Sequence, residues 1–452
     1  MARLADLCLP TQHSPKIEYE LSSMSVIAAE KPLGKKPLNV TPFTTGILDD
    51  AMPGKSDSAE AIQAEAAPLE LTFITTREAF NALEADWNEL YSLAGKPGNP
   101  FQSFGWCWHW ANNFMTGGDR NSFAIVTGRR NGKLTTIWPL VCQKSSGLTH
   151  LNWIGRPVTQ YGDVLVDSTN PLQDLRAGWN FLKAQAKADT VELYKVRADA
   201  AIAPLLPEIG AIATHHDVAR YADLTKHPTF TEYAQQRYSK KRRNVLRRYR
   251  RRFEEMGDVK LQILNEGAET TERVRELLAM KMQWLKAKSL VSTALQDPRT
   301  HTFFIDAVSD TSHPTGCRVT LLTCDDKLIA GDINFAVKNR SAAHVITYDL
   351  AYEKWSPGHL MTMSNLECSM QDGNEIFDFM GPDATFKQEW SDDAIEVDDW
   401  AVPLTLKGSL WCKVYLGFAR DRLKQGYQHL PTSVKKAIAG TFATLLLVVD
   451  KV

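Results

Sequence analysis

The spacing of apolar residues predicts that helices and strands alternate along the first half of the chain. Apolar residues three and four positions apart indicate helices, and short runs rich in Val, Ile, Leu and Thr indicate strands. We expect helices at residues 77–93, 104–114 and 172–188, and strands at 69–75, within 123–141, at 161–167 and at 190–196.

The second half repeats this order. We expect helices at residues 238–257, 271–288 and 358–373, three strands within 318–350, and further strands at 375–380 and 398–406. Turns at Asp325-Asp326 and at Asn339-Arg340-Ser341 separate the three strands. Segments 124–140 and 320–335 are alike, because each holds an apolar strand, a polar turn, Lys-Leu and a second apolar strand. The pattern therefore predicts two copies of one α/β unit, joined near residues 226–231.

The two ends of the chain differ from these units. Residues 1–68 hold seven prolines and no sustained apolar period, which is typical of a mobile tail. Residues 406–452 are basic, and they end in an apolar helical stripe that is too short to span a bilayer. The stripe consists of Val434, Ile438, Phe442, Leu445 and Val449. It either packs on the protein or rests on a membrane surface. The expected divisions are 1–68, 69–225, 226–405 and 406–452.

The composition adds limits on class and location. The 452 residues exceed the roughly 250–300 at which one hydrophobic core stops growing, so at least two domains are expected. With 44% hydrophobic residues and a net charge of −1, the chain is an ordinary globular one and is not built throughout to bind polyanions. Its seven cysteines form no CxxC pair, which favours a reducing compartment. Without a signal peptide or spanning segment, the cytoplasm is the expected location.

The segment from Ser356 to Leu360 is the most informative for chemistry. No nucleophile elbow, Walker phosphate loop, dinucleotide fingerprint or HExxH zinc motif occurs in the chain. The adjacent histidines His215 and His216 are interpreted as a loop pair without a metal. Ser356 suits an N-cap, Pro357 suits the first helical turn, and Gly358 permits close approach of a ligand to the backbone. This helix start is either an anion site or simply a well-capped end.

An ordered series of motifs resembles the CelD-like acetyltransferases, a branch of the GNAT superfamily related to the Fem-type peptidyltransferases. The motifs in the first half of the chain are Pro100, Phe101, Gln102, Ser103 and Trp106. The motifs in the second half are the basic helix with Gly257, Tyr348-Asp349, Ser356 to Leu360, Gly373, Phe377-Asp378-Phe379, Gly381, Phe386-Lys387 and Trp390. The resemblance covers about residues 70–400. It implies an α/β fold of two tandem GNAT-like domains, each with a mixed, largely antiparallel sheet flanked by helices.

The resemblance also implies a function. An acyl group moves from acetyl-CoA or a longer acyl-CoA to an amine or hydroxyl, without a metal. Relatives are linked to exopolysaccharide production, including cellulose biosynthesis, and to lipid amines, so the implied acceptor is an envelope polysaccharide or lipid precursor. Peripheral contact with the inner membrane face would suit such a role. The strand at 328–336 would lie beside the pantetheine arm, and Ser356, Pro357, Gly358, His359 and Leu360 would hold the pyrophosphate of the cofactor.

Acyl transfer to an amine needs a group that removes a proton, since an alkylamine with a pKa near 10.4 is charged at pH 7. We expect Asp349 to be that base, with Asp332 second. Asp332 and Asn334 share one strand face, which either faces a cleft or is exposed on an edge strand. By resemblance, Lys387 would stabilise developing negative charge, unless it is a surface lysine. Tyr348 would protonate the leaving thiolate, unless it only covers the core.

The remaining features bear on the two halves. Ten Lys and Arg lie between residues 237 and 252, but Val245, Leu246, Tyr249, Phe253 and Met256 form an apolar stripe there. A solvated helix face, or a cationic rim for coenzyme A phosphates or an anionic acceptor, is therefore ranked above nucleic-acid binding. The aromatic helix at 104–114 is expected to be buried between the domains, with a groove for an acyl chain or sugar as the alternative.

The two halves are not expected to be equivalent. At residues 168–174 the first half has no glycine at its helix start, so its cofactor loop is expected to be lost and it would shape the acceptor side. Two other functions stay open. One is a Fem-like aminoacyl-tRNA-dependent transferase, and the other is a non-catalytic module that has kept the fold.

Overall fold

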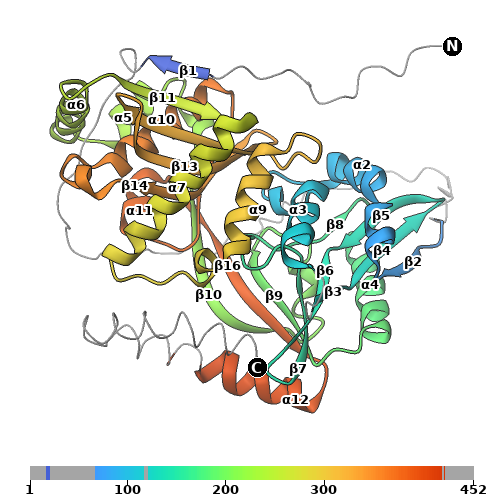
Figure 1. Ribbon diagram of the computed structural model, residues 1–452. Helices are drawn as coiled ribbons and strands as arrows, with labels where there is room; N and C mark the ends of the chain where they lie inside the picture. Colours follow the sequence, from blue (N-terminus) through green and yellow to red (C-terminus); the bar gives the residue numbers. More distant parts are fainter. Residues whose placement is uncertain (1–16, 21–66, 117–120, 420–421, 423–452) are drawn as a thin grey trace, which may run out of the picture.

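The computed structural model describes residues 17–20, 67–116, 121–419 and 422, and Figure 1 shows its elements. Apart from the short strand β1 (Ile17–Glu20), the expected N-terminal tail lies outside the described residues up to residue 66. The apolar stripe from Val434 onward also lies outside them. Everything that follows concerns the described ranges.

Twelve strands form one large sheet, in the order β1-β11-β12-β13-β14-β15-β10-β16-β9-β7-β6-β3, and four strands form a smaller one, in the order β2-β4-β5-β8. Their bounds are β2 (Glu70–Ile74), β3 (Asn121–Phe123), β4 (Ile125–Arg130), β5 (Lys133–Trp138), β6 (Leu140–Ser145), β7 (Leu148–Trp153), β8 (Leu165–Val166), β9 (Thr190–Arg197), β10 (Ile212–Asp223), β11 (Val259–Leu264), β12 (Cys317–Cys324), β13 (Lys327–Val337), β14 (Arg340–Tyr348), β15 (Ile376–Met380) and β16 (Asp393–Pro403).

Helices pack on both sheets. Their bounds are α1 (Arg77–Asn81), α2 (Glu84–Ala94), α3 (Phe104–Phe114), α4 (Pro171–Gln185), α5 (Phe230–Arg237), α6 (Lys240–Glu254), α7 (Gly267–Ala287), α8 (Thr293–Gln296), α9 (Pro298–Ser309), α10 (Pro357–Gln371), α11 (Thr385–Trp390) and α12 (Leu406–Leu410). A 3₁₀ segment η5 (Leu350–Trp355) precedes α10, and a π-helical segment η6 (Trp411–Ala419) follows α12.

The expected repeat is confirmed by the topology. The β4–β5 and β12–β13 hairpins both turn through two residues with positive φ, Asn131-Gly132 and Asp325-Asp326, as a two-residue hairpin turn requires. In each half the hairpin strands are antiparallel, and each half also contains one parallel pair, β7 with β9 and β14 with β15. The fold is therefore α/β with two tandem copies of one unit.

The two halves exchange strands at the centre of the large sheet. Strand β10 follows β9 in sequence but pairs with β15, and β16 follows β15 but pairs with β9. The two exchanged strands pair with each other from Ile212 to Tyr221, and Figure 1 shows them running between the halves. The boundary at residue 226 stays a prediction, but β10 already pairs with the second half.

Helices cover both faces of the second half of the sheet. On one face α9 packs between α7 and α3 of the first half, and on the other face lie α5, α6 and α10. Helix α3 is buried nearly all round, as expected, because its residues contact both halves. The ring of Trp106 lies 4.6 Å from that of Phe303 and 5.3 Å from that of Phe335.

Several elements differ from the expectations. The helix expected at 77–93 is interrupted between Asn81 and Glu84, and the strand expected at 161–167 is reduced to two residues. The second turn lies at Lys338-Asn339, which both have positive φ, rather than at Asn339-Arg340-Ser341. His215 and His216 do not lie in a loop, because both belong to β10 and pair with β16. Strands β7, β10 and β11 and helices α5 and α9 had no counterpart in the pattern.

The described part of the C-terminal segment docks on the first half. Cys412 and Leu416 are buried against strand β16, and the Trp411 indole N–H donates to Glu192 Oε1 (2.7 Å). Across the described ranges, no helix has the length and apolar character that crossing a membrane requires.

Candidate acyl-transfer site

A cleft opens where the parallel strands β14 and β15 separate. They pair only at Arg340–Ile376, Ser341–Phe377 and Ala342–Asp378, and then diverge. The space between them is lined by side chains from both strands, from α10 and α11, and from one loop of the first half. The lining residues are Gln160, Ala343, His344, Ile346, Thr362, Asn365, Phe377, Phe379, Met380, Gly381, Phe386 and Lys387.

A bulge in β14 explains why the strands part at this point. Against β13, Ile333 pairs with Val345 but Asn334 pairs with Ala343, so His344 is an extra residue. A bulge bends its strand and leaves one residue without a ladder partner. The bend carries β14 away from β15 and turns backbone polar groups toward the opening.

Helix α10 begins beside this opening. Ser356 precedes it in a left-handed conformation (φ 53°, ψ 52°), and its side chain makes no capping hydrogen bond. Ser356 therefore does not cap the helix through its side chain, as the alternative interpretation of this segment expected. The first turn of α10 keeps its positive dipole end. A Cβ atom on Gly358 would lie 3.4 Å from the Tyr348 ring, an ordinary contact. One and two turns further on, Thr362 and Asn365 face the cleft.

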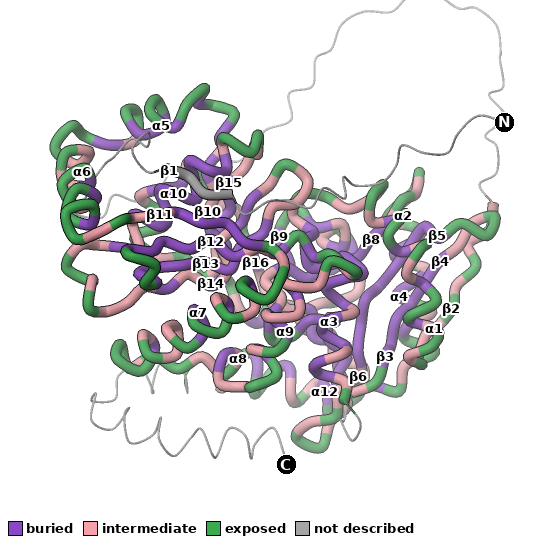
Figure 2. The backbone as a smooth tube through the Cα atoms, turned by 45° about the horizontal axis from the view of Figure 1, so that its top comes forward, coloured by how far each residue is buried: buried purple, intermediate pink, exposed green. Residues whose placement is uncertain are grey.

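The basic helix α6 lies along the segment that leads into α10. Its apolar stripe is buried at Leu246 and Phe253, whereas Met256 lies beyond the helix end and is exposed. The Arg252 guanidinium stands 5.8 Å from the Trp355 ring, one residue before Ser356. Figure 2 shows that α6 is mostly exposed along its outer side. The expected cationic rim therefore borders the start of α10.

Asp332 lies at the centre of β13, fully buried, next to the cleft rather than in its lining. The alternative of an exposed edge strand is wrong, since β13 runs between β12 and β14. The Asn365 amide donates to Asp332 Oδ2 (2.9 Å), and Oδ1 has no hydrogen-bond partner among the described residues. Burial raises the pKa of Asp332 to about 8, although the His344 amide and the Lys281 charge oppose this shift.

Lys281, which the sequence did not single out, approaches the same region from α7. Its ammonium donates to the Ile346 carbonyl (2.8 Å), and burial lowers its pKa to about 8 while Asp332 opposes that change. The available signal was a lysine between Met280 and Met282 on an amphipathic helix. Two ionisable groups, Asp332 and Lys281, are thus held next to the cleft with pKa values near neutrality, as functional sites often require.

Lys387 lines the cleft and is 9% exposed, so it is not a surface lysine. Its ammonium donates to the carbonyls of Met380 (2.7 Å) and Pro382 (2.9 Å). Burial lowers its pKa to about 8, against the opposing charges of Asp378, Asp217 and Asp383. An ammonium has three donors, so one remains beyond these two bonds.

The other two expected site residues lie at the edge of the site. Asp349 Oδ1 accepts a hydrogen bond from the Ala351 amide (2.9 Å), and Oδ2 lies 3.0 Å from Lys327 Nζ. The Tyr348 hydroxyl donates to Glu353 Oε1 (3.1 Å). Both residues hold the turn into η5, so the geometry brings Asp332 and Lys387 to the cleft but keeps Asp349 and Tyr348 outside its lining.

His344 is a titratable residue that lines the cleft and that the sequence did not single out. It is enclosed by Phe101, Phe304 and Phe335, and burial lowers its pKa to about 4. Its Nε2 lies 2.8 Å from the Val158 carbonyl oxygen, so Nε2 carries the proton and the ring is neutral. The Nδ1 atom has no partner among the described residues.

The first half has the same strand arrangement without the opening. Strands β7 and β9 also pair at three positions, ending at Asn152–Glu192. The next residue is Trp153, in the place that Ala343 occupies in the second half, and it is 2% exposed. Its indole packs so tightly on the following loop that a Cβ atom on Gly162 would lie 1.9 Å from the ring nitrogen. Trp153 therefore fills the equivalent gap.

Comparison with protein families gives a match for the region that contains the cleft. Residues 240–388 match the family model described as acetyltransferase (GNAT) domain. This match lies within the second half of the chain. The matched range contains α6, α10 and every cleft residue except Gln160. A search of the curated proteins gives no match. In the described ranges, no group of three or more His, Cys, Asp or Glu side chains is placed to hold a metal ion.

Three solved structures that are similar to the chain are distant from it in sequence. A protein of unknown function from Bacteroides thetaiotaomicron VPI-5482 has 12% identity and a TM-score of 0.46, over 74% of this chain and 100% of the other. The structure of FemX has 12% identity and a TM-score of 0.46, over 76% and 99%. A tandem GNAT protein from the clavulanic acid biosynthesis pathway has 12% identity and a TM-score of 0.44, over 74% and 99%. At this distance they say nothing of activity.

Proposed function

We propose that the protein is an acyl-CoA-dependent acyltransferase that uses the cleft between β14 and β15. The observation that carries the proposal is the opening in the GNAT domain with the uncapped start of α10 beside it. A narrow cleft with apolar walls suits the pantetheine arm and acyl group, and Ile346, Phe377, Phe379 and Phe386 supply such walls. The helix start suits the pyrophosphate.

The cofactor loop would consist of Ser356, Pro357, Gly358, His359 and Leu360. Pro357 has no N–H group, and those of Ser356, His359 and Leu360 already donate to backbone carbonyls. The Gly358 N–H would therefore meet a phosphate oxygen at the positive end of α10. Burial lowers the pKa of His359, and Arg242 contributes to that shift, so the His359 ring is neutral at pH 7 and adds no charge of its own. The positive charge would come from the α6 rim, with Arg252 beside Trp355.

For the chemical step, the acceptor amine must lose a proton before it attacks the thioester carbonyl. We propose Asp332 as the group that takes this proton through a water molecule, because Asn365 links it to the cleft. With a pKa of about 8, only the ionised fraction of Asp332 would act as the base at pH 7, and this fraction rises with pH. Lys387 would stabilise the oxyanion with its remaining donor. Asp349, the first expectation, is paired with Lys327 and is the weaker candidate.

The acceptor is proposed from the resemblance rather than from the cleft. An amine or hydroxyl of an envelope polysaccharide or lipid precursor would suit a CelD-like enzyme, and the C-terminal segment would keep such an enzyme at the inner membrane face. Incubation with a panel of acyl-CoA donors and amino-sugar or lipid-amine acceptors tests this. The absence of transfer to both kinds of acceptor would contradict this proposal.

Calorimetric titration with coenzyme A tests the donor directly. We expect binding by the parent protein and a strong loss in Gly358→Asp. Absence of binding in the parent would refute acyl-CoA dependence, and binding without any acyl transfer would favour the non-catalytic module.

A second candidate, an aminoacyl-tRNA-dependent transferase, is favoured by the exposed arginines of α6, since tRNA is a polyanion. A gel-shift assay at physiological salt distinguishes the two. Retention of tRNA there, with loss on Arg247→Gln and Arg248→Gln, would support this candidate, and no shift would exclude it.

A further inference from the structure

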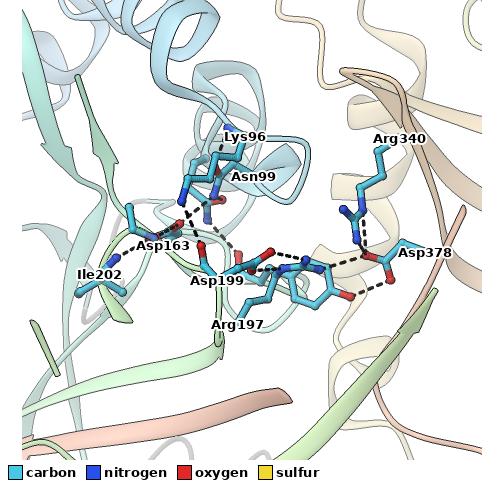
Figure 3. Close-up of polar contacts among 11 residues, drawn as sticks. Lys96, Asn99, Asp163, Arg197, Asp199, Ile202, Arg340 and Asp378 are labelled. Atoms are coloured by element: carbon cyan, nitrogen blue, oxygen red, sulfur yellow. Dashed lines mark hydrogen bonds and ion pairs between the residues drawn. The ribbon is translucent and has the colours of Figure 1, made fainter. Parts of the chain in front are cut away.

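A second pocket lies between the two halves, on the other side of the sheet from α10. Lys96, Asn99, Asp163, Arg197 and Asp199 of the first half border it, together with Arg340 of β14. A neighbouring pocket shares Tyr161 and Arg340 with it and reaches Met380, which also lines the cleft. Figure 3 shows that Lys96 and Arg197 approach this space from one side and Arg340 from the other.

Two buried guanidinium groups meet at Asp378 in this region. Asp378 Oδ2 accepts hydrogen bonds from Arg197 Nη1 (3.3 Å) and Arg340 Nε (3.1 Å), and it forms an ion pair with Arg340 Nη2 (2.9 Å). Asp378 Oδ1 accepts from the Tyr161 hydroxyl (2.9 Å) and the Met380 amide (2.7 Å). The carboxylate therefore accepts four hydrogen bonds, about as many as the lone pairs of its two oxygens allow.

The guanidinium groups still have donors to spare. Each has five N–H groups. Arg197 uses one for Asp378 and two for Asp199. Arg340 uses one for Asp378, and its Nη2 forms an ion pair with the same carboxylate. Arg340 Nη1 makes no hydrogen bond among the described residues. It is also not one of the buried side-chain atoms that lack a partner. It therefore reaches open space at the pocket.

The acidic side chains of the pocket are already satisfied. Both oxygens of Asp199 face the Arg197 fork (2.8 and 2.9 Å). Asp163 is buried and accepts from Asn99 and from the backbone amides of Val164, Ala201 and Ile202. The Lys96 ammonium donates only to the Asp199 carbonyl (3.0 Å), so no carboxylate neutralises it directly. The pocket thus offers more donors than acceptors.

The equivalent place in the first half is filled by protein. There, His150 and Glu192 stand at the same register as Arg340 and Asp378, because each basic residue pairs with the residue two before the acid. The Trp411 indole covers that pair and donates to Glu192. In the second half the Tyr161 hydroxyl donates to Asp378 instead, and Arg340 lines the pocket.

We infer that the pocket between the halves binds a phosphoryl group, and that this group belongs to the acyl acceptor. Three cationic groups, Lys96, Arg197 and Arg340, surround one space, which suits a tetrahedral oxyanion with several terminal oxygens better than a planar carboxylate. The link to the acceptor rests on the proposed function, since the pocket lies beside the cleft on the face away from the cofactor loop. Binding of the phosphoryl group does not depend on it.

Pyrophosphate binding, measured by calorimetry, tests the site. The Gly358→Asp variant serves as the background, because it removes the other expected phosphate site at α10. Within that background, Lys96→Gln and Arg340→Lys are each expected to weaken pyrophosphate binding about tenfold, as loss of a charge-assisted bond does. Lys144→Gln, an exposed lysine on β6, removes the same charge elsewhere and should change affinity less than about twofold. Thermal unfolding checks that each variant is folded.

The outcomes separate this inference from the proposed function. Pyrophosphate binding that is absent, or equal in all four proteins, would overturn the site. Sodium acetate competing as well as pyrophosphate at equal ionic strength would overturn the phosphoryl assignment in favour of a carboxylate. If the parent protein binds no coenzyme A but the Lys96→Gln effect holds, the acyltransferase proposal fails and the phosphoryl site stands. If coenzyme A binds and the effect is missing, only this inference fails.

Discussion

Gly358 offers a test in which stability and ligand binding should change in opposite directions. A Cβ atom there meets only the Tyr348 ring, at 3.4 and 3.6 Å, so both Gly358→Ala and Gly358→Asp should fold. Alanine in place of glycine within a helix adds up to about 1 kcal/mol of stability. An acidic residue in the first turn adds about 0.3–1 kcal/mol through the helix dipole.

The same aspartate should oppose coenzyme A. Repulsion between its carboxylate and one phosphate charge about 4 Å away amounts to about 1 kcal/mol in water and about 4 kcal/mol at an effective dielectric constant of 20. This corresponds to a loss of affinity between about fivefold and several hundredfold. Because salt screens the repulsion, part of the loss should return at about 1 M ionic strength.

Calorimetric titration with coenzyme A and thermal unfolding of the three proteins provide the measurement. The expected result is a Gly358→Asp protein that melts no lower than the parent yet binds much more weakly than Gly358→Ala. If the two variants bind within twofold of each other at low salt, the start of α10 does not hold the phosphates. A lower melting temperature in both variants would instead mean that the Tyr348 contact is tighter than the distances indicate.

Three further predictions concern buried positions. The pKa of Asp332 is about 8 in the folded protein and near 4 in the unfolded chain, so the stability of the parent falls as the pH rises through this window. Denaturant titrations should therefore show Asp332→Asn gaining stability relative to the parent from pH 5 to pH 8. A constant difference in stability would contradict this. Gly105→Ala would place a Cβ atom 2.5 Å from the Pro314 carbonyl oxygen, so unfolding should become easier by about 1–3 kcal/mol, and an unchanged melting temperature would show that α3 can shift. Tyr161→Phe removes a hydrogen bond to the Asp378 carboxylate and should cost about 1.5–3 kcal/mol in chemical denaturation, whereas Tyr91→Phe, whose hydroxyl has no partner among the described residues, should cost nothing comparable.

Elements with strong local signals could be predicted from the sequence. The Asp325-Asp326 turn, the start of α10 at Pro357 and the burial of α3 all depend on residues close together in the chain. Strand β10 could not be predicted in this way, because its segment THHDVARYAD alternates weakly and it owes its place to pairing with β15 and β16. Its status as a central strand comes from the exchange between the halves.

The site shows the same division. Lys387 and Asp332 were named in advance, from the resemblance and from their strand face. Asp378 appeared only as a motif residue, since its partners Arg197 and Tyr161 lie 181 and 217 positions away in the sequence. No local pattern carries such a contact. A lysine whose helix neighbours are apolar, as at Lys281, was the one missed signal that a closer reading of periodicity would have found.

The repeat itself explains why only one cleft is present. In both halves a basic residue at the start of the parallel pair forms an ion pair with an acid on the neighbouring strand, His150 with Glu192 and Arg340 with Asp378. Both halves therefore keep the strand geometry that lets the pair diverge. In the first half Trp153 fills the gap. In the second half the gap stays open, and Arg197 from the first half is what completes the charge pairing at Asp378. The closed half therefore contributes to the open one through the exchanged strands and this ion pair. A substitution at Arg197 should affect the cleft, although Arg197 lies outside the range that matches the GNAT family model.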